Sequence, residues 1–211
     1  FIMKKVAITQ VLLLNQNYFE MREALDVKWG ALFKKLNFLP VILPIEFNYK
    51  EYFKSIKIDG IILSGGNDLS AINKDYLSSK RDKFEKKIIR YGIKNNIPIL
   101  GMCRGMEIIA DQFGAKFKRV RGQVGIRHKL KVNEKSKYFR QLKEISTVNS
   151  FHNYAIDILP KEMIVSATNE NGMIKAMEHK KYKIFGQMWH SEREKFFDKN
   201  QINLIKKFFL T

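Results

Sequence analysis

The sequence predicts an α/β fold, with a mostly parallel central sheet that carries helices on both faces and extra antiparallel strands. Two observations predict it. Short apolar segments at 6–8, 58–63 and 97–101 are separated by longer stretches in which apolar residues keep a helical spacing, and such alternation builds parallel sheets through crossover helices. After residue 128 the apolar segments are short and separated by turns, which is typical of additional strands.

The first third of the chain contributes two predicted strands and one helix. Residues 6–8 follow two lysines and are continuously apolar, as in a buried strand. Over 18–36, apolar side chains recur three to four positions apart, so we expect an amphipathic helix there. Residues 39–44, closed by a proline, then predict a short strand.

The middle of the chain repeats this order. We expect a strand over 58–63, which Gly65 and Gly66 break into a loop, and then a helix over 81–94. A third strand at 97–101 leads into a further helix at 106–113. Later strands are expected at 128–132, 146–151, 163–168, 172–179 and 182–190, and a closing helix at 201–209.

Composition limits the classes of protein that the chain can belong to. With 211 residues, 45% of them hydrophobic, it can form one domain over 1–211. Its single cysteine can form no internal disulfide, and no apolar stretch reaches the roughly 20 residues of a membrane-spanning helix. We therefore expect a cytoplasmic protein without a membrane partner, and the sequence leaves its oligomeric state open.

The net charge of +18 allows two interpretations. A strong positive field concentrates anions, so a non-catalytic basic module that binds nucleic acid is one hypothesis. The lysines are, however, spread along the chain in short groups, and neither an RNA-recognition signature nor a zinc-ligand spacing accompanies them. We therefore expect no nucleic-acid partner, no metal and no cofactor.

The only cysteine lies in "GMCRG", residues 101–105, between an apolar strand and a helix. This is the form of a nucleophile elbow, whose glycines permit a strained turn and close approach of neighbouring chain. The turn would place Cys103 at a helix N-terminus, which favours the thiolate, and would direct the Arg104 N–H toward an oxyanion. The loop with Gly65 and Gly66 is the natural source of a second donor. The alternative is a small buried thiol without a catalytic role.

Four histidines could serve this thiol as a base. His190 ends the predicted strand "IFGQMWH", and Glu192 follows two positions later. A carboxylate at that distance can hold one imidazole nitrogen while the other faces the thiol. A His-x-Glu pair taken alone would more often be a surface pair. Because it accompanies the elbow here, we predict a catalytic triad of Cys103, His190 and Glu192.

Four motifs together carry a family resemblance: "LSGGND" at 63–68, "GMCRGME" at 101–107, "VNSFHNYAI" at 148–156 and "GQMWHSE" at 186–192. In this order and spacing, over nearly the whole chain, they resemble the γ-glutamyl hydrolase branch of the class I glutamine amidotransferase-like superfamily, typified by γ-glutamyl-γ-aminobutyrate hydrolase. The resemblance implies a flavodoxin-like α/β domain that hydrolyses a γ-glutamyl amide through a cysteine-linked thioester.

The resemblance also implies roles for individual residues. Cys103 attacks, His190 transfers the proton and Glu192 orients the imidazole. The backbone amides of Gly66 and Arg104 form the oxyanion hole. The expected contacts to the glutamyl group, including its α-carboxylate and ammonium, come from Gly65, Asn149, Ser150, Phe151 and His152.

Three positions depart from the commonest family pattern. Glu107 replaces a glutamine, Ser191 a proline, and Asn153-Tyr154 a His-Gln pair. The predicted triad survives these changes, but the group attached to glutamate stays undetermined. Glu107, one helical turn after the cysteine, pairs either with the substrate ammonium or with solvent or a lysine, and the sequence favours neither.

Known members of this branch act on different acceptors. Some remove γ-glutamyl groups from amines such as putrescine derivatives, and others release a nucleotide amidate from γ-glutamyl-CDP-amidate during capsule decoration. The basic segment 119–131, which contains Arg127 and His128, would suit a phosphorylated substrate, and its alternative is a mobile charged loop. We therefore expect a γ-glutamyl-nucleotide amidate as the substrate.

An ammonia-supplying glutaminase subunit is the alternative within the superfamily. Such a subunit must dock to a separate synthase, whereas a free-standing hydrolase needs no partner. The arginine after the cysteine in "GMCRG" is more typical of the hydrolase branch. We therefore favour hydrolysis.

Overall fold

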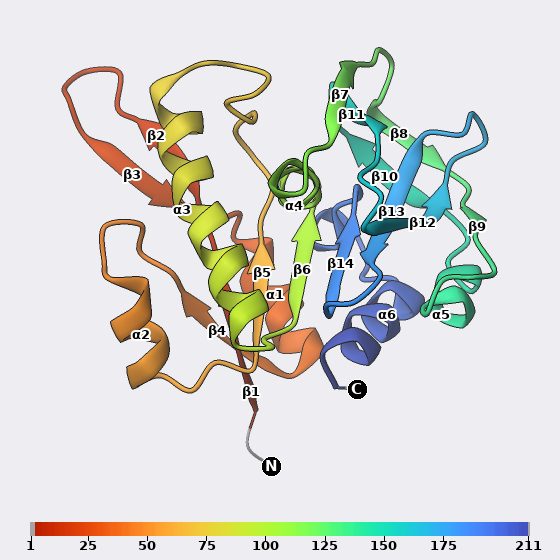
Figure 1. The fold of residues 1–211 in the computed structure, drawn as a ribbon, viewed down its shortest axis with the longest axis horizontal. Coiled ribbons are helices and arrows are strands. Elements are labelled where there is room, and N and C mark those ends of the chain that lie inside the picture. The colour runs from red at the N-terminus through yellow and green to blue at the C-terminus, as the bar shows by residue number, and fades with distance from the viewer. Residues whose placement is uncertain (1–2, 211) are drawn as a thin grey trace.

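The computed structural model describes residues 3–210 of the chain (Figure 1). Its strands are β1 (Lys4–Ile8), β2 (Val11–Leu14), β3 (Met21–Ala24), β4 (Phe38–Ile42), β5 (Gly60–Leu63), β6 (Ile99–Met102), β7 (Lys116–Arg119), β8 (Val124–His128), β9 (Lys131–Val132), β10 (Val148–Phe151), β11 (Tyr154–Ile158), β12 (Met163–Thr168), β13 (Ile174–His179) and β14 (Ile184–Gln187). Its α-helices are α1 (Lys28–Leu36), α2 (Tyr49–Ser55), α3 (Tyr76–Lys94), α4 (Arg104–Gln112), α5 (Phe139–Lys143) and α6 (Lys199–Leu210).

An eight-stranded sheet forms the centre of the molecule, in the order β4-β1-β5-β6-β14-β13-β12-β9. The neighbours from β4 through β14 are parallel, whereas β13, β12 and β9 continue the sheet with antiparallel pairing. This arrangement confirms the predicted fold class. Because β5, β6 and β14 are parallel, their carboxyl ends meet at one edge of the sheet, where ligands bind in open α/β folds.

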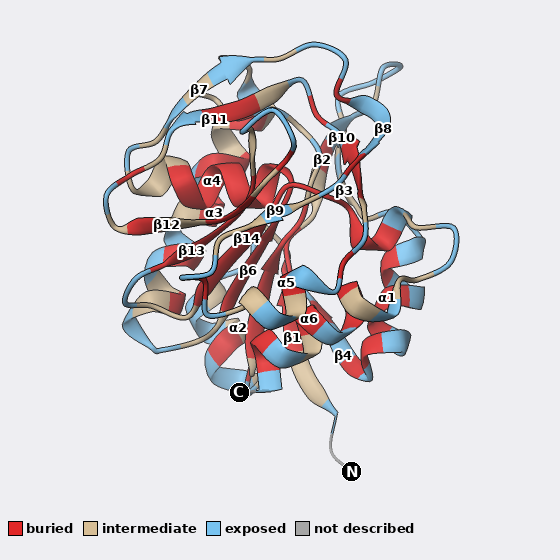
Figure 2. Ribbon diagram, turned by 90° about the vertical axis from the view of Figure 1, so that its right-hand side faces the viewer, coloured by how far each residue is buried: buried red, intermediate tan, exposed pale blue. Residues whose placement is uncertain are grey.

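Helices cover both faces of this sheet. In β1, Val6 and Ile8 belong to the core shared with α1, α5 and α6, whereas Ala7 belongs to the core shared with α2, α3 and α4. This alternation follows from the period of two along a strand. Figure 2 shows that buried residues concentrate in the central strands and in α4, while β7 and β8 are largely exposed.

The helix predicted over 18–36 is wrong in its first half. β3 lies there instead and forms an antiparallel hairpin with β2, and α1 begins only at Lys28. A local turn precedes the helix, because the Asp26 carboxylate accepts a hydrogen bond from the Lys28 N–H at 2.9 Å. Apolar spacing alone does not reveal the hairpin, since half of its pairing partners lie in 11–14, outside the periodic segment.

Other elements differ from the prediction mainly at their ends. α3 begins at Tyr76, earlier than predicted, because the Asp75 carboxylate accepts a hydrogen bond from the Ser78 N–H at 2.8 Å and caps the helix. The basic segment 119–131 is not a free loop, because its residues 124–128 form β8, which pairs with β10. Sequence patterns do not predict the short elements α2, α5, β7 and β11. No helix within residues 3–210 combines the length and hydrophobicity that crossing a membrane requires.

Candidate active site

Cys103 follows β6 directly, and α4 begins at the next residue. Its backbone has φ 53° and ψ −112°, a conformation that residues with a side chain seldom adopt. Two hydrogen bonds hold the turn: the Cys103 N–H donates to the Gln187 carbonyl at 2.8 Å, and the Cys103 carbonyl accepts from the Met106 N–H at 2.8 Å. The nearly buried thiol is therefore fixed at a helix N-terminus, beside the end of β14.

The two glycines of this turn have no room for a side chain. A Cβ on Gly101 would lie 2.3 Å from the Gly105 carbonyl oxygen, and a Cβ on Gly105 would lie 1.9 Å from the Leu63 carbonyl oxygen. Both clashes are with backbone, which cannot rotate away as a flexible side chain can. The glycines therefore allow β5, β6 and α4 to approach closely enough to form the strained turn.

His190 comes from the segment after β14, the strand beside β6. Its Nδ1 lies 2.6 Å from Glu192 Oε1, both side chains are buried, and the imidazole lines the same pocket as Cys103. Burial lowers the pKa of His190, but the negative charges of Cys103 and Glu192 outweigh it and raise the pKa to about 10. The structure thus brings the three residues of the predicted triad together, in the order that nucleophilic acyl transfer requires.

The loop after β5 passes beside Cys103 and the imidazole of His190. A Cβ on Gly65 would lie 2.8 Å from His190 Cε1 and 3.6 Å from Cys103 Cβ. Gly66 has φ 80°, a left-handed conformation that glycine adopts without strain. The N–H of Arg104 belongs to the first turn of α4, where helical N–H groups have no partner within the helix. Two backbone donors are thereby available near one thiol.

A pocket of about 140 Å³ opens at this edge of the sheet. It is lined by Gly66, Asn67, Asp68, Cys103, Arg104, Glu107, Phe151, His152, Asn153, Tyr154, His190 and Arg193. A larger hollow of about 500 Å³ lies between α5 and the start of α6, but neither cysteine nor histidine lines it. We place the candidate site in the smaller pocket because Cys103, the predicted nucleophile, and His190, its predicted base, both line it.

Two carboxylates line the pocket beside the thiol. Glu107 lies in the first turn of α4, and Asp68 lies in the loop after β5. Burial raises the pKa of Glu107 to about 7. The negative charge of Asp68 also raises this pKa, whereas the guanidinium of Arg104 lowers it. Since Glu107 is only 6% exposed, it does not face open solvent.

A buried lysine that sequence analysis does not single out lies behind the opposite wall. Lys175, on β13, is 1% exposed, and its Nζ lies 2.9 Å from His152 Nε2, 3.3 Å from Ser150 Oγ and 3.3 Å from Gln123 Oε1. Burial lowers the pKa of Lys175 to about 8. The ammonium is therefore mostly charged at neutral pH, among neutral partners.

These contacts fix the protonation of His152. Its Nδ1 lies 2.7 Å from the Tyr154 carbonyl oxygen, which only accepts, so Nδ1 carries the proton and Nε2 accepts from Lys175. Burial, together with the charge of Lys175, lowers the pKa of His152 to about 4. His152 is therefore a neutral part of the pocket wall and supplies no positive charge to a carboxylate.

Of the expected contacts to the glutamyl group, Phe151 and His152 line the pocket, whereas Gly65, Asn149 and Ser150 do not. The Asn149 side chain binds the backbone of His190, donating to its carbonyl at 2.7 Å and accepting from its N–H at 2.8 Å. Ser150 is fully buried against Lys175. The structure therefore gives Asn149 the geometry of a residue that positions His190.

Arg127 and His128, the expected phosphate contacts, also lie outside the pocket lining. The Arg127 guanidinium donates to the Glu194 carboxylate at 2.9 and 3.2 Å. His128 is buried, with Nε2 2.8 Å from Gln123 Oε1. Both side chains are occupied by protein partners because β8 packs against β10 instead of forming a free loop.

Arg193 is a pocket-lining cation that sequence analysis missed. It belongs to the 3₁₀ turn Ser191–Arg193 after His190, its guanidinium lies 5.3 Å from the centre of the Phe151 ring, and its Nε lies 3.8 Å from Glu192 Oε1. Its place three residues after the predicted base was the available signal. Among the residues that the structure describes, no group of three or more His, Cys, Asp or Glu side chains is arranged to hold a metal ion.

A family model and a curated relative both match most of this chain. The family described as Peptidase C26 matches residues 8–192. The γ-glutamyl-CDP-amidate hydrolase of Campylobacter jejuni is 39% identical over 207 residues, which cover 97% of this chain and 96% of that protein.

Two solved structures are similar in fold. A protein of Thermoplasma acidophilum matches with a TM-score of 0.74 and 22% identity, over 99% of this chain and 94% of the other. A glutamine amidotransferase from Thermotoga maritima matches with a TM-score of 0.66 and 19% identity, over 98% and 84%. At these identities the likeness shows the glutamine amidotransferase fold.

Proposed function

Because this chain belongs to the Peptidase C26 family, we propose that it hydrolyses a γ-glutamyl amide through a γ-glutamyl thioester on Cys103. One observation carries the proposal. The single thiol of the chain is held in a strained turn and shares a pocket with His190, whose Nδ1 lies 2.6 Å from Glu192 Oε1. The thiol lines a pocket, so a substrate carbonyl can reach it.

The first half of the reaction forms the thioester. The Cys103 sulfur, whose proton His190 holds, attacks the γ-carbonyl carbon, and the carbonyl electron pair moves onto oxygen. The N–H groups of Gly66 and Arg104 bind this oxyanion. When it collapses, the C–N bond breaks and His190 gives its proton to the leaving nitrogen.

The second half hydrolyses the thioester. A water molecule attacks the thioester carbonyl while His190 takes its proton, and collapse of the oxyanion breaks the C–S bond. Glutamate leaves, and the proton on His190 restores the starting pair with Cys103. Glu192 orients the imidazole, and Asn149 fixes the backbone of His190.

The chemistry of the pocket supports an anionic leaving group. Glu107 and Asp68 form an acidic side suited to the ammonium of the glutamyl group, whereas Arg193 supplies a cation that can bind phosphate. The relative from Campylobacter jejuni is named for hydrolysis of γ-glutamyl-CDP-amidate. We therefore propose a γ-glutamyl-nucleotide amidate as the substrate class, with its phosphate toward Arg193.

Glutamate release from four compounds tests this proposal: glutamine, γ-glutamyl-GABA, γ-glutamyl-putrescine and γ-glutamyl-CDP-amidate. We expect release from the nucleotide amidate alone, and a loss of at least about 10⁴-fold in kcat for Cys103→Ala. Glu192→Gln should lose less, because it disturbs the orientation of His190 and not the bond that forms.

The other outcomes are informative. Turnover of γ-glutamyl-GABA comparable to that of the nucleotide amidate would reject the substrate class but keep the hydrolase. Release from glutamine alone, or only after a partner is added, would indicate an ammonia-supplying subunit. Salt-dependent binding to random duplex without any turnover would favour the basic binding module.

A further inference from the structure

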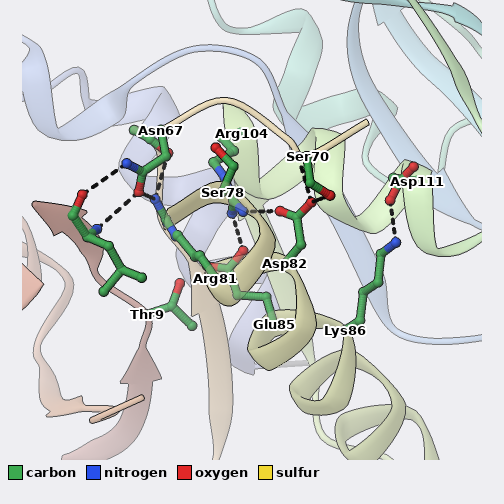
Figure 3. A network of polar contacts seen from close by, with 12 residues as sticks. Thr9, Asn67, Ser70, Ser78, Arg81, Asp82, Glu85, Lys86, Arg104 and Asp111 are labelled. Carbon is green, nitrogen blue, oxygen red and sulfur yellow. Dashed lines mark hydrogen bonds and ion pairs between the residues drawn. The ribbon is translucent and has the colours of Figure 1, made fainter. Parts of the chain in front are cut away.

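A buried network of charged side chains connects α3 to both proposed oxyanion donors (Figure 3). α3 contributes Arg81, Asp82 and Glu85, which share one face because their spacing matches a helical turn. Arg104, from the first turn of α4, pairs with both carboxylates, and Arg81 Nε lies 3.0 Å from Glu85 Oε1. All four side chains are almost completely buried, so water does not screen these pairs.

Arg81 holds the loop that carries Gly66. Its guanidinium donates to three consecutive backbone carbonyls, those of Ser64 at 2.9 Å, Gly65 at 3.0 Å and Gly66 at 2.6 Å. Three successive carbonyls aimed at one side chain fix the orientation of the intervening peptide planes. A planar, rigid fork of donors suits this task better than the single ammonium of a lysine.

The direction of the Gly66 N–H follows from these contacts. None of the described peptide bonds is cis, and in a trans peptide the C=O and the N–H point in opposite directions. Because Arg81 holds the Gly65 carbonyl, the Gly66 N–H of the same peptide points away from α3. The other side of the loop faces the pocket, which Gly66 lines together with Cys103 and His190, so this N–H is on the side of the proposed nucleophile.

The network also sets the spacing of the two donors. Arg104, whose own N–H is the second donor, is tied through its side chain to Asp82 and Glu85. Asp82 additionally accepts from the Ser70 N–H at 2.8 Å, further along the same loop. Both donor-bearing segments are therefore held by one helix. A cation at the Gly65 carbonyl also polarises that peptide and strengthens its N–H as a donor.

From this geometry we infer that Arg81 is a positioning residue for catalysis: it aims the Gly66 N–H at the oxyanion without contacting the substrate. This inference rests on the proposed function, because it concerns an oxyanion that only carbonyl chemistry creates. Arg81 lies on α3 and does not line the pocket, so it would act only through the backbone of the loop that carries Gly66.

Two reactions at Cys103 separate this role from a merely structural one. Hydrolysis of the γ-glutamyl conjugate develops an oxyanion. Alkylation by iodoacetamide does not, because the sulfur forms a bond to a saturated carbon while iodide leaves. Since Cys103 is the only cysteine in the chain, the alkylation rate reports on this thiol alone. A structural disturbance of the turn would change both reactions.

For Arg81→Lys we expect kcat to fall by about 10²-fold or more, as for loss of an oxyanion donor, with KM within about twofold and the alkylation rate unchanged. The matched control is Arg90→Lys on the same helix, where Arg90 is exposed and donates a hydrogen bond to Gln112 at 3.2 Å. This control should leave kcat, KM and alkylation as in the wild type.

A second variant keeps the test decisive should Arg81→Lys fail to fold. The double variant Arg81→Met/Glu85→Gln removes one charge of each sign and leaves Arg104 paired with Asp82. It should show the same loss in kcat with normal alkylation. Parallel losses in kcat and alkylation, or an unchanged kcat, in either variant would overturn the positioning role. Absence of glutamate release by the wild type would instead reject the proposed function.

Discussion

The thiol of Cys103 lies between two buried polar clusters of different construction. On the α3 side, the guanidiniums of Arg81 and Arg104 face the carboxylates of Asp82 and Glu85, so that the formal charges cancel. On the β13 side, Lys175 contacts a neutral imidazole, a hydroxyl and an amide. Within residues 3–210, this lysine forms no ion pair.

The difference shows how a buried charge can serve either rigidity or adjustment. Burial, with the repulsion of Arg104, lowers the pKa of Arg81 only to about 10, because the carboxylates oppose it. Burial lowers the pKa of Lys175 to about 8, close to neutral pH. The first cluster therefore keeps its charges and suits the fixed donors of an oxyanion hole, whereas the second can change its charge near physiological pH.

The largest effect is expected from breaking the charge balance on the α3 side. Glu85→Gln leaves two buried guanidiniums with one carboxylate, so the free energy of unfolding should fall by about 3–5 kcal/mol. Urea unfolding at pH 7 measures this change. The matched control is Lys86→Ala on the same helix, which removes a partly exposed pair with Asp111 at 2.6 Å and should cost less than about 1 kcal/mol.

The pH dependence of that difference in stability reports on the charge of Glu85. Burial opposes ionisation of Glu85, but Arg104 and Arg81 outweigh it and lower the pKa below 4.5. The stability that this carboxylate contributes is therefore complete above pH 4.5 and is lost as the pH falls through the lower folded-state pKa. The gap between wild type and Glu85→Gln should narrow below pH 4.5. Equal stability of the two proteins at pH 7 would contradict the charge-balanced description.

A smaller effect distinguishes two arginines near the other cluster. Arg193→Ala should raise KM for a phosphorylated γ-glutamyl substrate by about tenfold or more, because a hydrogen bond to a charged group contributes about 1.5–3 kcal/mol. KM for γ-glutamyl-GABA should change little. Arg127→Ala should leave both KM values within about twofold, since Arg127 is paired with Glu194. A selective rise in KM for Arg127→Ala instead would favour the phosphate contact inferred from the sequence.

Features set by adjacent residues could be predicted from the sequence. The turn at Cys103 needs only its two glycines between a strand and a helix, and the structure shows the backbone clashes that exclude other residues there. Glu192 is two positions from His190, so their contact requires little knowledge of the fold. The roles of these residues in catalysis stay predictions, which the proposed assays address.

Features set by distant partners could not be predicted in this way. Charge alone does not reveal that Arg127 pairs with Glu194, 67 positions away, or that Lys175 meets His152, 23 positions away. Both contacts depend on how β8, β10 and β13 pack. The hairpin of β2 and β3 was not predicted for the same reason, because pairing between segments overrides local apolar spacing.

The smallest effect concerns Lys175 and asks whether its cluster is adjustable. Burial is the larger cause that lowers the pKa of His152 to about 4, and Lys175 is the second. Lys175→Met keeps an unbranched side chain but removes the charge, so the pKa of His152 should rise while staying below 6.5. One unit of rise corresponds to about 1.4 kcal/mol. NMR titration of the histidine Cε1–H signals measures it, with the exposed Lys129→Met as the control.

The sign of the accompanying stability change follows from linkage. Because the pKa of His152 in the folded protein lies below 6.5, the unfolded chain binds more protons between pH 6.5 and 4, and the wild type loses stability as the pH falls through that window. Lys175→Met should lose less over the same window. An unchanged titration midpoint would mean that burial alone sets the pKa of His152. The charge of Lys175 would then have no measurable effect on the imidazole 2.9 Å away, and the two clusters would differ in their number of ion pairs but not in electrostatic coupling between neighbours.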